Sequence, residues 1–328
     1  MFYNKMENMT DIYLTIDLEC RLDCADYQCP IYGRINGTSE SYGLDFILET
    51  FKKYDLKATF FVEPFFSYRF GLRSLREVCD KILSQQHDIQ LHMHPYFKST
   101  KDKIFEDRLY AYNYADQLSL IREAKDILLK CGAASPVAFR AGSFAASNTT
   151  YDALDSCGIK ISSSYNLNYL NQICKIGLSG QYNYPFLYKG KILEMPVTCF
   201  CEFNPLKFLP MYRHMQIGAV SFPEMRWVIE KAGSTDSKYV VILLHTFEFV
   251  NFNQRNKNGN KFDKVNISRF LSLCKFLSGN RDKIEIKKMC DIDMIQRFQR
   301  GNHNDEIPRM PIKLLALGGF ERIKKRMR

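Results

Sequence analysis

No stretch of this sequence is apolar over enough residues to cross a membrane. The longest apolar runs, such as residues 238–245, are far shorter than the roughly 20 residues that a transmembrane helix needs. Residues 1–10 also lack the apolar core of a signal peptide. We therefore expect a soluble, cytoplasmic protein.

The sequence also lacks internal repeats, low-complexity segments and any linker that would divide it. With 328 residues, 46% of them hydrophobic, the chain can bury a full core. We predict one domain over residues 1–300 and a basic C-terminal tail over residues 301–328. Residues 322–328 are nearly all basic, so we expect either weak contact with an anionic membrane surface or a solvated tail.

The charges are not balanced, and the net charge of +10 favours anionic partners in general. Nucleic acid, acidic lipid and acidic glycan all satisfy this condition, so charge alone selects none of them. No nucleic-acid partner is expected, and the oligomeric state stays open.

Strand-like and helix-like segments alternate along the chain. Strands are predicted at residues 12–18, 56–62, 88–92, 137–139, 159–163, 191–197, 239–244 and 284–288. Helices are predicted at residues 42–54, 72–85, 115–131, 148–157, 223–232, 266–277 and 291–300, with Asn148 as the N-cap of the fourth. This alternation implies an α/β fold with a parallel sheet, and seven or eight such units suggest a closed barrel.

Polar residues of complementary chemistry stand at the carboxyl ends of four predicted strands. They are Asp17 and Glu19, His92 and His94, Arg140, and His245. Side chains alternate along an extended chain, so His92 and His94 point the same way. In a (β/α) barrel these strand ends meet on one face, where catalytic residues are expected.

Five segments, in this order, resemble the motifs of the polysaccharide deacetylases, which share the NodB homology domain. The segments are Thr15-Ile16-Asp17-Leu18-Glu19, Lys57-Ala58-Thr59-Phe60-Phe61-Val62, His87-Asp88-Ile89-Gln90-Leu91-His92, Arg140-Ala141-Gly142-Ser143-Phe144 and Leu243-Leu244-His245. The resemblance covers roughly residues 12–293. It implies a distorted (β/α) barrel, commonly with about seven parallel strands.

The resemblance also implies roles for individual residues. Asp17 is the catalytic base, Arg140 holds that carboxylate, and His245 is the general acid. Glu19 and His92 are ligands of a divalent metal ion such as zinc.

The chain departs from the family pattern at two places. The usual pair of adjacent aspartates is here Asp17-x-Glu19. Tyr96 occupies the position of the usual second histidine, so geometry assigns that ligand to His94. A protonated phenol binds zinc poorly, whereas neutral imidazole needs no deprotonation. Glu63 or a loop cysteine is the next candidate.

The residue types themselves suit hydrolysis of an amide or ester. Such a reaction near neutral pH needs an activated water, stabilisation of the oxyanion and a proton for the leaving group. No serine or cysteine nucleophile has a base and an orienting acid at recognisable positions, so we expect the reaction to require a divalent cation. The expected substrate is an N- or O-acetylated sugar or glycan intermediate of surface polysaccharide biosynthesis.

Other readings stay open. Cys20, Cys24 and Cys29 follow the first strand, where radical enzymes anchor an iron–sulfur cluster, but their spacing favours reduced thiols or an accessory structural metal. The eleven cysteines as a whole are expected to be reduced. His245 taken alone is an even choice between a functional and a core histidine. Glu248 either orients His245 or faces solvent, and the second role is the one expected. A non-catalytic relative that binds a glycan or a protein partner, or another amide hydrolase on the same barrel, is the alternative function.

Overall fold

The computed structural model describes residues 9–21, 24–35, 37–202, 211–235, 238–252, 259–292, 307–311 and 314. One curled sheet dominates it, with strand order β10-β1-β2-β3-β4-β5-β7-β6. The strands are β1 (Thr10–Leu18), β2 (Thr59–Val62), β3 (Asp88–Met93), β4 (Ala138–Ala141), β5 (Ile161–Ser162), β6 (Phe186–Tyr188), β7 (Ile192–Glu194) and β10 (Tyr239–His245).

The pairing in this sheet is parallel except for the edge strand β6, which runs antiparallel to β7. A short strand, β13 (Ile284–Lys287), pairs in parallel with the first half of β1. The prediction of a distorted parallel barrel of about seven strands is therefore confirmed.

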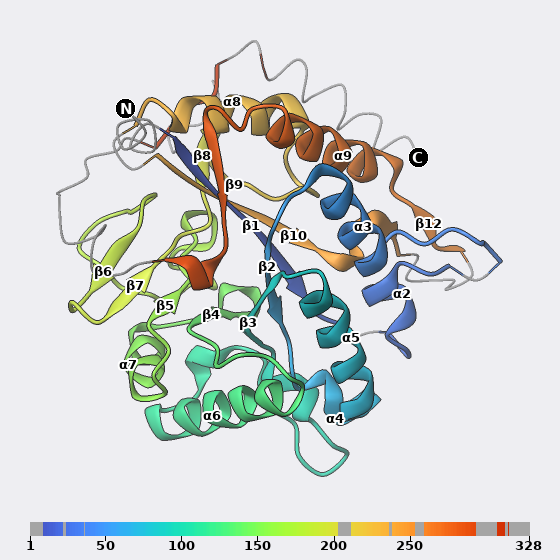
Figure 1. The fold of residues 1–328 in the computed structure, drawn as a ribbon. Helices are drawn as coiled ribbons and strands as arrows, with labels where there is room; N and C mark the ends of the chain where they lie inside the picture. Colours follow the sequence, from blue (N-terminus) through green and yellow to red (C-terminus); the bar gives the residue numbers. More distant parts are fainter. Residues whose placement is uncertain are drawn as a thin grey trace.

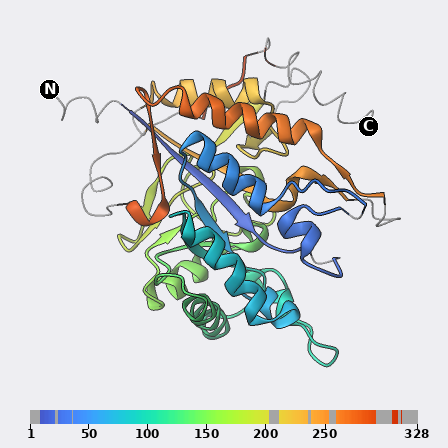
Figure 2. The same cartoon turned by 45° about the vertical axis from the view of Figure 1, so that its right-hand side comes forward.

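Helices cover the outside of the curled sheet (Figure 1). They are α2 (Gln28–Tyr32), α3 (Leu44–Tyr54), α4 (Phe66–Phe70), α5 (Leu72–Ser84), α6 (Tyr114–Lys130), α7 (Asn148–Ser156), α8 (Phe222–Ala232) and α9 (Lys264–Ser278). Helix α5 illustrates the cause, since Leu75, Val78, Cys79 and Ile82 recur at helical spacing and are buried. Figure 2 shows the long arrow of β1 crossing the middle of the molecule.

Strand β1 is buried on both faces because helices cover one face and the barrel interior fills the other. Ile12, Leu14 and Ile16 pack in the larger cluster beneath the helices. Tyr13 packs in a second cluster with side chains from β2, β7 and β10. The alternation places Asp17 and Glu19 on the same side of the strand as Tyr13, toward the barrel interior.

The barrel is not closed by a complete ladder. Among the described residues, no ladder joins β7 to β10. The outer edge of β10 instead bonds to single residues, with Leu243 N–H donating to Met215 O at 2.8 Å and Thr198 N–H to Val241 O at 3.3 Å. Two antiparallel hairpins, β8 (Cys199–Glu202) with β9 (Met211–His214) and β11 (Val250–Asn251) with β12 (Lys261–Phe262), complete the strands.

Most predicted elements lie close to observed ones, but the sequence predicts no element for the short segments α4, β6, β8, β9, β11 and β12. The N-cap of α7 is Ser147 rather than Asn148, because Ser147 and Thr150 form a reciprocal capping box. Helix α2 lies inside the segment that was expected to be a loop. The predicted helix 291–300 falls mostly outside the described residues.

Part of the predicted tail packs on the domain. Cys201 N–H donates to Pro308 O at 2.8 Å, and Met310 N–H donates to Cys201 O at 2.9 Å. Met310 is buried in the larger hydrophobic cluster. Residues 322–328 lie outside the described residues. Among the described helices, none combines the length and apolar character that a bilayer crossing requires.

His87, at the start of β3, is buried as a neutral imidazole. Its Nδ1 accepts a hydrogen bond from Ala58 N–H at 3.2 Å, and its ring packs against Phe51 and Phe60. Burial, with the positive charge of Lys57 as a smaller cause, lowers the pKa of His87 to about 4. A proton therefore binds His87 more tightly in the unfolded chain than in the folded one.

This difference predicts a pH-dependent stability. The contribution of His87 is complete above its unfolded pKa of about 6.5 and disappears as pH falls toward about 4, a change on the order of 3 kcal/mol. We expect His87→Asn, which keeps an acceptor for Ala58 N–H, to flatten this part of the profile. Urea unfolding of chelator-treated protein between pH 7 and pH 4 measures it. Equal slopes for the two proteins would contradict the assignment.

Candidate metal centre and active site

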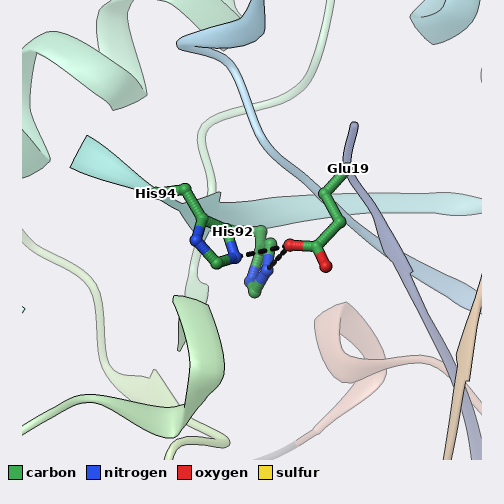
Figure 3. Close-up of side chains that lie close together, drawn as sticks. All are labelled: Glu19, His92 and His94. Carbon is green, nitrogen blue, oxygen red and sulfur yellow. Dashed lines mark hydrogen bonds and ion pairs between the residues drawn. The ribbon is translucent and has the colours of Figure 1, made fainter. Parts of the chain in front are cut away.

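Three side chains converge at the carboxyl ends of β1 and β3. Glu19 Oε2 lies 3.0 Å from His92 Nε2 and 2.5 Å from His94 Nε2. Figure 3 shows the carboxylate of Glu19 pointing at both imidazoles. One ligand atom from each residue fits within 4.8 Å of the others, and among the described residues this is the one group of its kind.

A hydrogen bond to the backbone orients the ring of His92. Its Nδ1 lies 2.9 Å from Arg140 O on the neighbouring strand β4, and a carbonyl oxygen can only accept. Nδ1 therefore carries the hydrogen, and Nε2 presents its lone pair toward Glu19. This arrangement is the usual one for an imidazole that binds a metal.

Asp107 orients His94 in a similar way. The two oxygens of Asp107 lie 3.1 and 2.9 Å from His94 Nδ1, so that nitrogen donates and Nε2 is left for Glu19. The imidazole ring of His94 also lies close to the backbone of Gly142. A Cβ atom at Gly142 would come within 2.5–2.6 Å of the ring, so only glycine fits this position of the Arg140 motif.

These donor atoms fit a divalent cation. His94 Nε2 is buried and finds no hydrogen-bond partner in the described ranges, although a carboxylate oxygen of Glu19 lies close by. Burial alone would raise the pKa of Glu19, but the adjacent His94 and His92 hold it well below its usual value, so the carboxylate is available as an anionic ligand. Two imidazole nitrogens and one carboxylate oxygen with positions left open are a ligand set typical of catalytic zinc.

Asp17 and Arg140 form a buried ion pair beside this group. Arg140 Nη1 donates to Asp17 Oδ1 at 2.6 Å, and the guanidinium also donates to Ser163 O and Ser163 Oγ. Its plane lies over the ring of Phe61, with the centroid 4.3 Å away. Arg140 therefore occupies one oxygen of Asp17, and the other, Oδ2, lies on the side of His245.

His245 faces both acids of β1. Its Nε2 lies 3.9 Å from Asp17 Oδ2 and 3.8 Å from Glu19 Oε1. Its Nδ1 donates to Glu248 Oε1 at 2.8 Å. Burial alone would lower the pKa of His245, but the hydrogen bond and the charge of Glu248 raise it to about 9.

Glu248 is buried, so the expectation that it faces solvent is wrong. It lies on the 3₁₀ turn η5 (Thr246–Phe249), directly after β10, and its side chain is only 6% exposed. Besides His245, it accepts hydrogen bonds from Gln216 Nε2 and from Gly218 N–H. The turn folds the carboxylate back onto the strand end, which a linear pattern does not reveal.

The other residues considered as metal ligands either lie outside the group formed by Glu19, His92 and His94 or form hydrogen bonds to other residues. Tyr96 is 38% exposed and takes no part in the group. Glu63 is fully buried, and its carboxylate accepts from Phe65 N–H and Phe66 N–H. Burial raises the pKa of Glu63 to about 8. Cys20, Cys24 and Cys29 are free cysteines that form no metal-binding group in the described part of the chain.

Sequence reasoning missed two orienting residues, Asp107 and Gln216. Asp107 lies in the irregular segment between β3 and α6, and Gln216 lies between β9 and α8. Neither stands at a strand end or in a recognisable motif. Their role depends on which loops fold over the barrel face.

Comparison with known proteins supports the fold. No protein-family model and no curated protein sequence matches the chain. Among solved structures, a Mycobacterium smegmatis protein assigned as a polysaccharide deacetylase matches with a TM-score of 0.54 at 13% identity, over 97% of this chain and 92% of that one. A 4-α-glucanotransferase from Thermococcus litoralis matches with a TM-score of 0.55 at 11% identity, over 86% of this chain and 40% of that one. The chain therefore has the fold of the polysaccharide deacetylases, as the order of its motifs predicted.

Proposed function

We propose that this protein is a metal-dependent hydrolase that removes an acetyl group from an N- or O-acetylated sugar or glycan intermediate. One observation carries the proposal: a candidate base, a candidate acid and a candidate metal-binding group face the same space. Asp17 Oδ2 and Glu19 Oε1 both lie within 3.9 Å of His245 Nε2. The fold alone would not suffice, because a glucanotransferase shares it.

Glu19, His92 and His94 would hold the cation, with zinc as the expected metal. When bound, a divalent cation lowers the pKa of water and polarises an acyl oxygen. Asp17 takes the proton of the attacking water through Oδ2, while Arg140 holds the carboxylate in place through Oδ1. His245, held by Glu248, then delivers a proton to the departing nitrogen or oxygen.

A cytosolic acetylated sugar on the way to a surface polysaccharide is the substrate class that we propose. The second candidate is a barrel that binds a glycan or a protein partner without turnover. The replacement of the usual second histidine by Tyr96 favours that alternative, and metal content together with acetate release separates the two.

Metal removal is the direct test of the proposal. We expect chelator-treated protein to stop releasing acetate from a panel of acetylated hexosamines and acetylated sugar esters, and reconstitution with Zn²⁺ to restore release. Acetate is measured enzymatically and bound metal by elemental analysis. Undiminished turnover of thoroughly chelated protein would show that the mechanism is wrong.

Asp17→Asn separates the base from the metal ligands. Because the amide still accepts from Arg140 but takes no proton, we expect kcat to fall about 10²-fold to 10⁴-fold with bound metal unchanged. Asp11→Asn, at the other end of β1 and paired with Lys287, is the matched control and should keep its activity. Loss of metal from Asp17→Asn would instead make Asp17 a ligand.

The second imidazole ligand is tested by substitution at two neighbouring positions. His94→Ala removes a nitrogen that lies 2.5 Å from Glu19 Oε2, so we expect it to lose metal as severely as His92→Ala. Tyr96→Phe should retain metal, because Tyr96 lies outside the group. Equilibrium dialysis against Zn²⁺ gives the affinities without relying on turnover. Wild-type affinity in His94→Ala would refute the assignment.

A further inference from the structure

A second buried imidazole, His214, lies next to the machinery around His245. It ends strand β9 and is 5% exposed. His214 Nε2 lies 2.6 Å from Gln216 Oε1, and Gln216 Nε2 bonds to the carboxylate of Glu248. Gln216 therefore links His214 to Glu248, the carboxylate that accepts a hydrogen bond from His245.

The carboxylate of Glu248 determines every donor and acceptor in this chain of hydrogen bonds. A carboxylate only accepts, so Gln216 donates through Nε2 and accepts through Oε1. His214 consequently carries its hydrogen on Nε2, and its Nδ1 is an acceptor. This Nδ1 is buried and has no hydrogen-bond partner among the residues that the structure describes. Burial lowers the pKa of His214, so the ring stays neutral and Nδ1 keeps its lone pair near pH 7.

Asn166 provides an unpartnered donor in the same region. It is completely buried and caps the 3₁₀ turn η4 (Leu167–Tyr169), its Oδ1 accepting from Asn168 N–H at 3.0 Å. Cys199 Sγ, 3.7 Å away, also donates to Oδ1, and Cys199 is the register partner of His214 in the β8–β9 hairpin. Within the described part of the chain, Asn166 Nδ2 has no hydrogen-bond partner. Asn166 and His214 therefore both adjoin Cys199, one through a side-chain contact and the other through strand pairing, so the two unpartnered groups lie in the same region.

Aromatic rings adjoin this pair. Tyr169, which is half-buried, lies 5.4 Å from His214 between ring centroids and stacks on Phe144 at 5.9 Å. Phe144 belongs to the Arg140 motif and has φ of +59°, a strained value for a bulky residue. Strain of this kind is found where a functional arrangement requires it. Tyr169 therefore packs between His214 and Phe144. Phe144 belongs to the same motif as Arg140, whose guanidinium binds Asp17.

We propose that His214, Asn166 and Tyr169 form a subsite for the sugar ring of the substrate, where one hydroxyl group donates to His214 Nδ1 and accepts from Asn166 Nδ2. A hydroxyl group is both a donor and an acceptor, and the apolar face of a sugar ring packs on an aromatic ring. The subsite rests on the proposed deacetylase function and specifies how it selects a carbohydrate. A buried water offers the same chemistry, and the experiment separates the two.

Two variants test the subsite. Asn166→Asp keeps the oxygen that caps η4 but removes the donor, and His214→Phe keeps a ring against Phe144 and Tyr169 but removes the acceptor. Acetate release is measured on a panel of N-acetylhexosamines, and hydrolysis on 4-nitrophenyl acetate, which has no hydroxyl group. For both variants we expect the ratio of kcat/KM on the sugars to kcat/KM on the ester to fall about tenfold or more, mainly through KM.

Asn171→Asp, the same change at an exposed position of the same segment, is the matched control and should leave the ratio as in the wild type. Thermal melting shows whether each variant is folded. Equal losses on both probes, or no change in the ratio, would mean that the two groups hold only a structural water. A wild-type protein that hydrolyses the ester but none of the sugars would overturn the subsite alone. Failure on both classes of probe would overturn the proposed function itself.

Discussion

The site depends on Arg140, which is completely buried and forms hydrogen bonds to site residues through both its side chain and its backbone. The guanidinium holds Asp17 and is itself held by Ser163, while the carbonyl oxygen accepts from His92. Removing one partner of such a buried ion pair costs on the order of 3–5 kcal/mol, because the other charge is left uncompensated. A single residue of β4 thus links the candidate base on β1 to a candidate metal-binding imidazole on β3.

The orientation of the second imidazole, that of His94, depends on Asp107 in a loop and on the absence of a side chain at Gly142. Asp107 reaches His94 from the segment that follows β3, and Gly142 leaves the space that the ring occupies. Both devices set the direction of His94 Nε2 without contributing a ligand atom. Such outer partners commonly change the metal affinity of a site about 10-fold to 100-fold, so Asp107 and Gly142 matter to the proposal that His94 is the second imidazole ligand.

The parallel barrel explains why these residues meet but not which reaction they serve. Asp17, Glu19, His92 and His245 lie at or just after the carboxyl ends of strands that are neighbours in the sheet. The same fold carries a glucanotransferase. The reaction therefore has to be argued from the ion pair of Asp17, the hydrogen bond of His245 to Glu248 and the convergence of three ligand atoms.

The sequence by itself determined the parts that depend on local periodicity. Alternation in 12–18 predicted β1, and the apolar run in 239–244 predicted β10. The order of strands and helices predicted a parallel barrel with Asp17, Glu19, His92, Arg140 and His245 at strand ends. Only the tertiary structure decided that Glu248 folds back onto His245, that Asp107 holds His94, and that Asn166 and His214 both adjoin Cys199. Those contacts join residues through irregular segments, whose paths are set by packing across the barrel face and leave no period in the sequence.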